Sequence, residues 1–327
     1  MLKKPYKGYT KIVKNSFLRF STFYFKIPKN EKLERIIRSN YLTMVLENPQ
    51  DDGIHMSNYW KVYLPKVRIY LIPNETKPKK VLITHEGLTD SINLKFLTLA
   101  VHSLQILRNI YLLIRYRCGI NIIMKTFLIS IQTGRMLCFD MVKHAILVSR
   151  VLSKINLQHQ SQMVVIGDGL GFLGTMLKSL YPNTNITFVN LPKNLFLDHL
   201  FFTKVFNLAQ DQPMLIRADN FNGFKSNQLL FFNVASLSEM SHEQIDLYLN
   251  SIAEVGGTLV SLNRNTKNHP DGSLVNLSEM FDSRHCEIML DENPCEFYSK
   301  FPLRGFLRGF LPFDGEWHLK ILRFQNN

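Results

Sequence analysis

The sequence predicts an α/β fold in which a parallel sheet carries helices on both faces and follows a mainly helical N-terminal region. Three observations predict it. From Met163 onward, short apolar runs alternate with amphipathic stretches, which is typical of strand–helix–strand units. A glycine-rich turn joins the first run to a helix. Near the C-terminus, two apolar stretches at 296–301 and 317–324 have no helix between them, so they should pair antiparallel.

The composition permits a large core and points to anionic partners. The chain has 327 residues, of which 46% are hydrophobic and 20% charged, and this argues against wholesale disorder. The net charge of +13 suits nucleic acid, lipid headgroups or phosphate-bearing substrates without choosing among them. Neither a C-x-x-C pair nor a zinc-finger spacing is present, so we expect reduced thiols, no metal site and a cytoplasmic protein. The cysteines are Cys118, Cys138, Cys286 and Cys295.

Residues 1–155 are expected to form a mainly helical cap that shapes the substrate pocket. Its first part is basic and aromatic: residues 1–38 hold eleven Lys or Arg and two acids. Residues 1–28 either pack on the domain as an arm or touch an anionic membrane at its inner face. Further on, we expect helices over 31–46, over 91–131 with a break near Gly119, and over 135–154, and a short strand over 81–84. No apolar window approaches the ~20 residues that a membrane span needs.

Residues 156–327 are expected to form the second domain. Its apolar runs predict parallel strands at 163–166, 186–189, 214–216, 229–234 and 258–262. The stretches between them predict helices at 171–181, 194–207 and 241–254, and a further helix is expected near 274–281. Ser241 followed by Gln244 forms a capping box, which marks the start of the third helix.

The glycine-rich turn begins where the first strand ends. Gly167, Gly169 and Gly171 lack Cβ atoms where the chain must turn and where a ligand can press against the backbone. A helix that starts at Gly171 would leave free N–H groups beside a gap, which is the outline of a nucleotide site. The alternative is a tight strand-to-helix turn with no ligand.

Small or polar residues follow four of the predicted strands. In an open parallel sheet, ligands bind beyond the carboxyl ends of the strands. The four segments are Gly167–Gly171, Asn190–Pro192, Asp219–Phe221 and Asn233–Ser236. Together they predict a ligand site at this edge of the sheet.

This pattern resembles the class I S-adenosylmethionine-dependent methyltransferases, whose signature is the closing antiparallel hairpin. More narrowly, it resembles the bacterial family of sugar O-methyltransferases. The likeness covers residues 160–325 well and the N-terminal half loosely. The segments that carry it are Val164–Gly174, Phe188–Pro192, Asn233–Met240, Ser261–Asn263 and, more weakly, Ser57–Trp60.

The resemblance implies a Rossmann-like sheet and S-adenosylmethionine as the cofactor. The cofactor-binding residues would be Gly167, Asp168, Gly169, Gly171, Asn190, Leu191, Asp219, Asn220, Phe221, Asn233 and Ser236. Two departures matter, because Val165 and Asn190 stand where the class usually has acids. Asn can accept and donate hydrogen bonds but lacks the charge that strengthens them. We therefore expect weaker cofactor affinity, or compensation by Asp168.

Individual roles also follow from the resemblance. The three glycines would admit the methionine part and the ribose. Asn190 would bind the ribose hydroxyls. Asp219 would meet the adenine amino group, and Phe221 would cover the ring. Asn233 to Ser236 would line the sulfonium end.

The implied reaction is methyl transfer to the hydroxyl of a sugar, nucleotide-sugar or glycan in surface polysaccharide synthesis. The enzyme must position the acceptor oxygen and receive its proton. We expect Glu239 to be the base, with His242 as the second choice. The alternatives are that Glu239 binds nearby groups of the protein and that His242 is an exposed residue of a first helical turn.

Three other functions can be compared with the sequence. Gly169–Gly174 reads G-x-G-x-x-G, as in NAD(P)-dependent oxidoreductases, but counting from Gly167 at the strand end puts Phe172 at the sixth position. Specific nucleic-acid binding is not expected, because no aromatic and basic recognition motif is present. A non-catalytic methyltransferase-like binding protein is the third alternative.

Overall fold

The structure is a computed structural model. It describes residues 20–26, 31–46, 67–74, 77–86, 96–135, 137–157, 160–206, 212–223, 229–269, 272–293 and 317–324. Within this part of the chain, no helix is both long enough and apolar enough to cross a bilayer.

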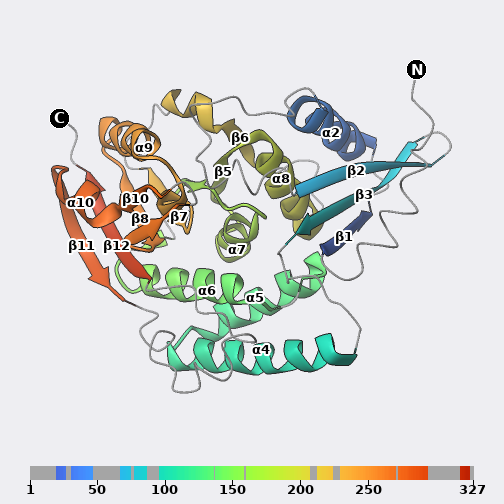
Figure 1. Cartoon of the computed structure of the whole chain (residues 1–327), viewed down its shortest axis with the longest axis horizontal. Helices are drawn as coiled ribbons and strands as arrows, with labels where there is room; N and C mark the ends of the chain where they lie inside the picture. Colours follow the sequence, from blue (N-terminus) through green and yellow to red (C-terminus); the bar gives the residue numbers. More distant parts are fainter. Residues whose placement is uncertain are drawn as a thin grey trace.

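A seven-stranded sheet forms the centre of the molecule (Figure 1), in the order β11-β12-β8-β7-β4-β5-β6. Its strands are β4 (Gln162–Ile166), β5 (Asn185–Asn190), β6 (Met214–Arg217), β7 (Leu230–Val234), β8 (Thr258–Asn263), β11 (Cys286–Glu292) and β12 (His318–Phe324). Strands β4 to β8 run parallel, and β12 pairs antiparallel with both β8 and β11. The predicted α/β fold with a closing antiparallel pair is therefore confirmed.

The sequence placed one strand of the closing pair wrongly. The partner of β12 is β11 and not the stretch 296–301, which lies outside the described residues. β11 reads Cys-Glu-Ile-Met-Leu-Asp-Glu, and Glu287, Ile288 and Asp291 are exposed. An edge strand with acids on its open side gives a weak apolar signal. The predicted helix at 274–281 is also shorter, because strand β10 (Leu274–Asn276) pairs with β9 (Thr266–Asn268) before α10 (Leu277–Asp282) begins.

Helices cover both faces of the sheet because side chains alternate along each buried strand. Among the described helices, five contribute to the core on one face: α4 (Phe96–Arg115), α5 (Ile120–Thr133), α6 (Phe139–Leu152), α7 (Phe172–Leu180) and α8 (Pro192–Phe206). On the other face, α9 (His242–Glu254) and α10 pack on Val164, Ile166 and Phe231. The predicted capping box at Ser241 and Gln244 is present.

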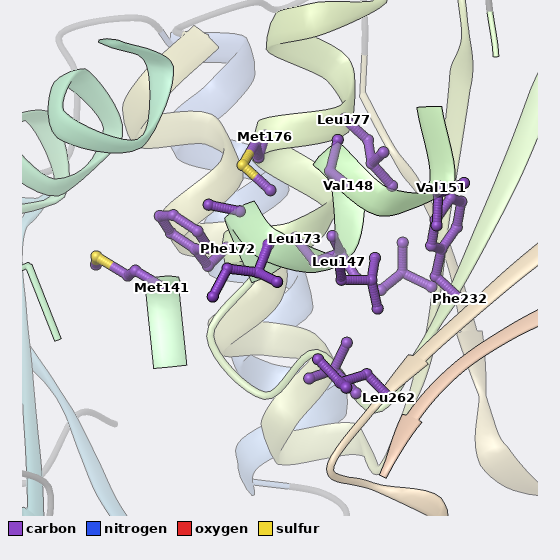
Figure 2. Close-up of a cluster of buried hydrophobic side chains, with 14 of the residues drawn as sticks. Met141, Leu147, Val148, Val151, Phe172, Leu173, Met176, Leu177, Phe232 and Leu262 are labelled. Carbon is purple, nitrogen blue, oxygen red and sulfur yellow. The ribbon is translucent and has the colours of Figure 1, made fainter. Parts of the chain in front are cut away.

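Helix α6 belongs to the same core as the sheet. Leu147, Val148 and Val151 are fully buried, and Figure 2 shows them among the side chains of α7 and of strands β7 and β8. The core therefore runs without a break across residue 155, although α6 precedes the first strand of the large sheet. The division into a cap over 1–155 and a cofactor domain over 156–327 stays a prediction.

The N-terminal part contains more strand than the sequence suggested. Strands β1 (Phe20–Lys26), β2 (Val67–Asn74) and β3 (Lys77–Glu86) form an antiparallel sheet in the order β1-β3-β2. The predicted helix at 31–46 is present as α2 (Glu31–Tyr41) and one π-helical turn, η2 (Leu42–Leu46). The small sheet packs on α8, where Val67, Ile69 and Ile83 share a core with Phe196 and Leu200. The predicted break near Gly119 separates α4 (Phe96–Arg115) from α5.

Candidate functional site

The site lies where the direction of chain crossover in the sheet reverses. From β4 the chain continues to β5 and β6 on one side and then returns to β7 on the other side of β4. Ligands of open parallel sheets bind in the crevice at this switch point. The glycine turn follows β4, and Ser236 follows β7, so the structure brings these two predicted segments together.

The three glycines of the turn have positive φ values of +72° at Gly167, +80° at Gly169 and +63° at Gly171, but their surroundings differ. A Cβ on Gly167 would collide with the side chain of Ser236. A Cβ on Gly171 would come within 2.6 Å of the carbonyl oxygen of Asp198 in α8. A Cβ on Gly169 would meet nothing within 4 Å. Only Gly169 therefore faces open space, where a ligand can lie against the backbone.

Asp168 caps helix α7. Its Oδ1 accepts a hydrogen bond from the backbone N–H of Leu173 at 3.1 Å, and its Oδ2 accepts one from Gly174 at 2.9 Å. Burial raises the pKa of this carboxyl to about 6, although the backbone donors act in the opposite direction. The expected free N–H groups at this helix N-terminus are thus engaged by the protein itself, which corrects the sequence interpretation.

Asp198 lies beside the glycine turn, and the sequence analysis did not single it out. It is fully buried in α8, where its Oδ1 accepts a hydrogen bond from the N–H of Gly171 at 2.8 Å. Its Oδ2 accepts one from Nδ2 of Asn190 at 2.9 Å. Burial raises the pKa of Asp198 well above its ordinary value, and the nearby Asp168 carboxyl raises it further. A single acid in the apolar run from Leu195 to Phe202 is the signal that could have identified it.

Asn190 is buried at the end of β5, and its amide is held on both sides. Besides donating to Asp198, it accepts a hydrogen bond from the N–H of Leu191 at 2.9 Å through Oδ1. Asn190 therefore connects β5 to α8 and to the glycine turn. The carboxyl of Asp198 therefore lies beside Asn190, but it is fully buried and both its oxygens are engaged.

Asn233 joins three strands at the same edge. Its Nδ2 donates to the carbonyl of Ile166 at 3.0 Å, and its Oδ1 accepts from Nδ2 of Asn263 at 2.8 Å. Because Asn233 has no exposed surface, its side chain does not line the site, and it holds the ends of neighbouring strands together. Ala235, the next residue but one, has a φ of 63°, a strained conformation for a residue with a Cβ.

Glu239 lies in a short 3-10 turn after β7 and pairs with Lys267 of β9, with 2.6 Å between Oε1 and Nζ. Burial raises the pKa of Glu239, while the Lys267 ammonium lowers it. Both side chains are largely buried. The alternative expected for Glu239, a contact with nearby groups of the protein, is therefore observed for its Oε1. His242 begins α9 at an exposed position, and no hydrogen bond joins it to Glu239 among the described residues.

The predicted adenine-binding segment lies in the turn after β6. Asp219 is exposed and makes a two-point pair with Arg217, at 3.0 and 2.7 Å, while Asn220 is exposed beside it. Phe221 is buried and packs edge-on against Phe231 and Tyr248. Its ring belongs to the core beneath the sheet, which corrects its expected role as a cover for the adenine ring.

Two side chains of α6 contact aromatic rings of other parts of the chain. His144 stacks on Phe172, the first residue of α7, with 5.5 Å between ring centroids. Burial lowers the pKa of His144 to about 3, so this imidazole is neutral. Lys143, also buried, places Nζ 3.9 Å from the ring centroid of Trp317. The sequence analysis did not single out His144, Lys143 or Trp317.

No protein-family model matches this chain, and no curated protein matches it either. Among solved structures, it is similar to a mitomycin 7-O-methyltransferase, with 14% identity, a TM-score of 0.39, and coverage of 57% of this chain and 56% of that one. A magnesium protoporphyrin IX methyltransferase from Synechocystis PCC 6803 with bound SAM gives 9% identity, a TM-score of 0.40, and coverage of 57% and 79%.

An O-methyltransferase from a multienzyme of Brevibacillus brevis, in complex with S-adenosyl-L-homocysteine, gives 11% identity, a TM-score of 0.40, and coverage of 57% and 74%. The Rossmann-like fold of the present chain is established by its own strand order and directions, to which these distant similarities add nothing.

Proposed function

We propose that the protein is an S-adenosylmethionine-dependent O-methyltransferase that acts on a sugar hydroxyl. One observation carries the proposal. At the switch point of the sheet, Gly169 faces open space, while carboxyl oxygens occupy the N–H groups of the adjoining helix. The site therefore offers a ligand the backbone of a glycine, and it does not offer an anion-binding helix end.

This arrangement opposes the dinucleotide alternative. A pyrophosphate would need the N–H groups at the start of α7. Asp168 accepts from two of them, and Asp198 accepts from the N–H of Gly171. A pyrophosphate would have to displace these carboxyls and would be repelled by any that were ionised. S-adenosylmethionine carries no phosphate, so its binding does not need these N–H groups to be free.

The resemblance in sequence around Val164–Gly174 and Asn233–Met240 supports the choice of cofactor and of a sugar acceptor. Bound S-adenosylmethionine would supply an activated methyl group. The backbone at Gly169 would hold it, while Asp198 and Asn190 fix the shape of the turn. We propose a sugar, nucleotide-sugar or glycan of a surface polysaccharide as the acceptor.

Glu239 is the base that we propose. Lys267 engages its Oε1, so Oε2 remains to receive a proton from the acceptor hydroxyl. A pKa raised by burial makes the carboxylate a stronger base than an exposed one. We also propose that the basic segment 1–28 brings a cytoplasmic enzyme to the inner membrane face. Since β1 is part of the N-terminal sheet, a deletion that tests this should end at residue 19.

The decisive experiment is calorimetric titration of the full chain with S-adenosylmethionine. Wild type should bind, and Gly169→Arg should not, because the side chain would fill the open space. Gly272→Arg is the matched control, since Gly272 has a φ of +83° and also faces open space. It should retain binding. Absence of binding to wild type, or binding of NAD(H) in its place, would overturn the proposal.

A further inference from the structure

Helix α5 carries an apolar stripe on the side that faces away from the core. A globular helix normally has one apolar face. The buried face of α5 includes Ile122 and Ile129. On its outer face, four large apolar residues are exposed at helical spacing: Ile120 (74%), Met124 (56%), Leu128 (48%) and Ile131 (72%).

Helix α4 has a second stripe of the same kind and lies along the lower edge of the molecule in Figure 1. Leu107, Tyr111 and Ile114 are spaced four and three residues apart and are 64%, 47% and 65% exposed. The turn at 116–119 connects the two helices. Seven large apolar side chains in two neighbouring helices exceed the scattered exposure that is normal for a soluble surface.

The charged residues within the segment that carries these stripes have one sign. The sequence from 91 to 139 contains no Asp or Glu, whereas it contains six Lys or Arg. Arg115 and Arg117, at the end of α4, are exposed. An anionic surface would be complementary to them.

We propose that the outer faces of α4 and α5 dock on an anionic lipid bilayer. Exposed Leu, Ile, Met and Tyr side chains beside arginines are the composition of helices that lie in the membrane interface. The apolar residues would enter the headgroup region, and the arginines would meet lipid phosphates. This surface is separate from the glycine turn, so the inference does not depend on the proposed methyl transfer.

The test is co-sedimentation of the full chain with vesicles of phosphatidylcholine alone and of phosphatidylcholine mixed with phosphatidylglycerol. Wild type should bind the mixed vesicles, and added salt should weaken the binding. The double variant Ile120→Asp/Ile131→Asp should lower the partition coefficient about tenfold or more. The matched control Leu274→Asp/Ile288→Asp changes two similarly exposed apolar residues elsewhere and should bind like wild type.

Three results would overturn the proposal. The first is equal binding to both kinds of vesicle. The second is unchanged binding of the Ile120→Asp/Ile131→Asp variant, with loss only on deletion of residues 1–19. The third is a wild-type dimer in light scattering that this variant converts to a monomer, because the surface would then join two copies of the chain. Circular dichroism of each variant confirms that it is folded.

Discussion

At the scale of single residues, the pair of Glu239 and Lys267 makes the sharpest prediction about activity. Glu239→Gln should lower kcat by about 10²-fold or more, because the amide cannot take the acceptor proton. Glu243→Gln, an exposed neighbour in α9, should leave kcat unchanged. The base works when ionised, so the rate should rise with pH through the pKa of Glu239.

Lys267→Met tests the same role without touching the carboxylate. The Lys267 ammonium lowers the pKa of Glu239, so its removal raises that pKa further. The acid limb of the kcat/KM profile should therefore move to higher pH. An unmoved limb in this variant would show that Glu239 is not the base, whatever the loss in kcat.

The second prediction concerns the two buried carboxyls beside the glycine turn. The folded protein holds the pKa of Asp168 at about 6, above the ordinary 3.8, so the folded state binds the proton more tightly. This contribution to stability is complete below pH 3.8 and is lost as pH rises through about 6. Asp198 has a raised pKa for the same reason and acts in the same direction.

Asp198→Asn keeps the shape of the side chain and removes one of these groups. Its free energy of unfolding in urea should fall less steeply than that of wild type when pH rises from about 4 to 7. Asp282→Asn, at an exposed position, should follow the wild-type curve. Parallel curves for wild type and Asp198→Asn would contradict a raised pKa of Asp198 in the folded protein.

At the scale of elements, the glycine-rich turn and helix α7 show which structural features a sequence motif predicts and which it does not. The sequence located the strand, the turn and the helix within one or two residues, because apolar periodicity and glycine positions are local properties. It did not reveal that Asp168 and Asp198 engage the helix end. Asp198 comes from another helix, and sequence spacing carries no information about such contacts.

Gly174 was the last glycine of the motif, yet the structure gives it a packing role. A Cβ there would collide with the ring of Phe188, which is fully buried in β5 and cannot move freely. Gly174→Ala should lower the free energy of unfolding by about 1–2 kcal/mol, since overpacking outweighs the gain in helix propensity. Gly119→Ala, where the added Cβ meets nothing within 4 Å, should cost less in the same chemical denaturation, because it loses only a favourable N-cap residue of α5.

At the scale of the whole molecule, the order of elements in the sequence conceals how the core is shared. The sequence suggests a boundary near residue 155, because strand–helix alternation begins there. In the structure, α6 precedes that point and still covers one face of the large sheet, as Figure 2 shows. Sequence patterns identify which residues are apolar, but not which distant element they pack against.

The shared core predicts that residues 156–327 do not fold alone. Without α6, the side chains of Leu177, Phe232 and Leu262 would lose their cover and expose apolar surface to water. We expect the isolated fragment to aggregate, and the full chain to unfold in one calorimetric transition with equal calorimetric and van't Hoff enthalpies. A monomeric fragment with a cooperative transition of its own would instead show that the N-terminal half is a separable cap.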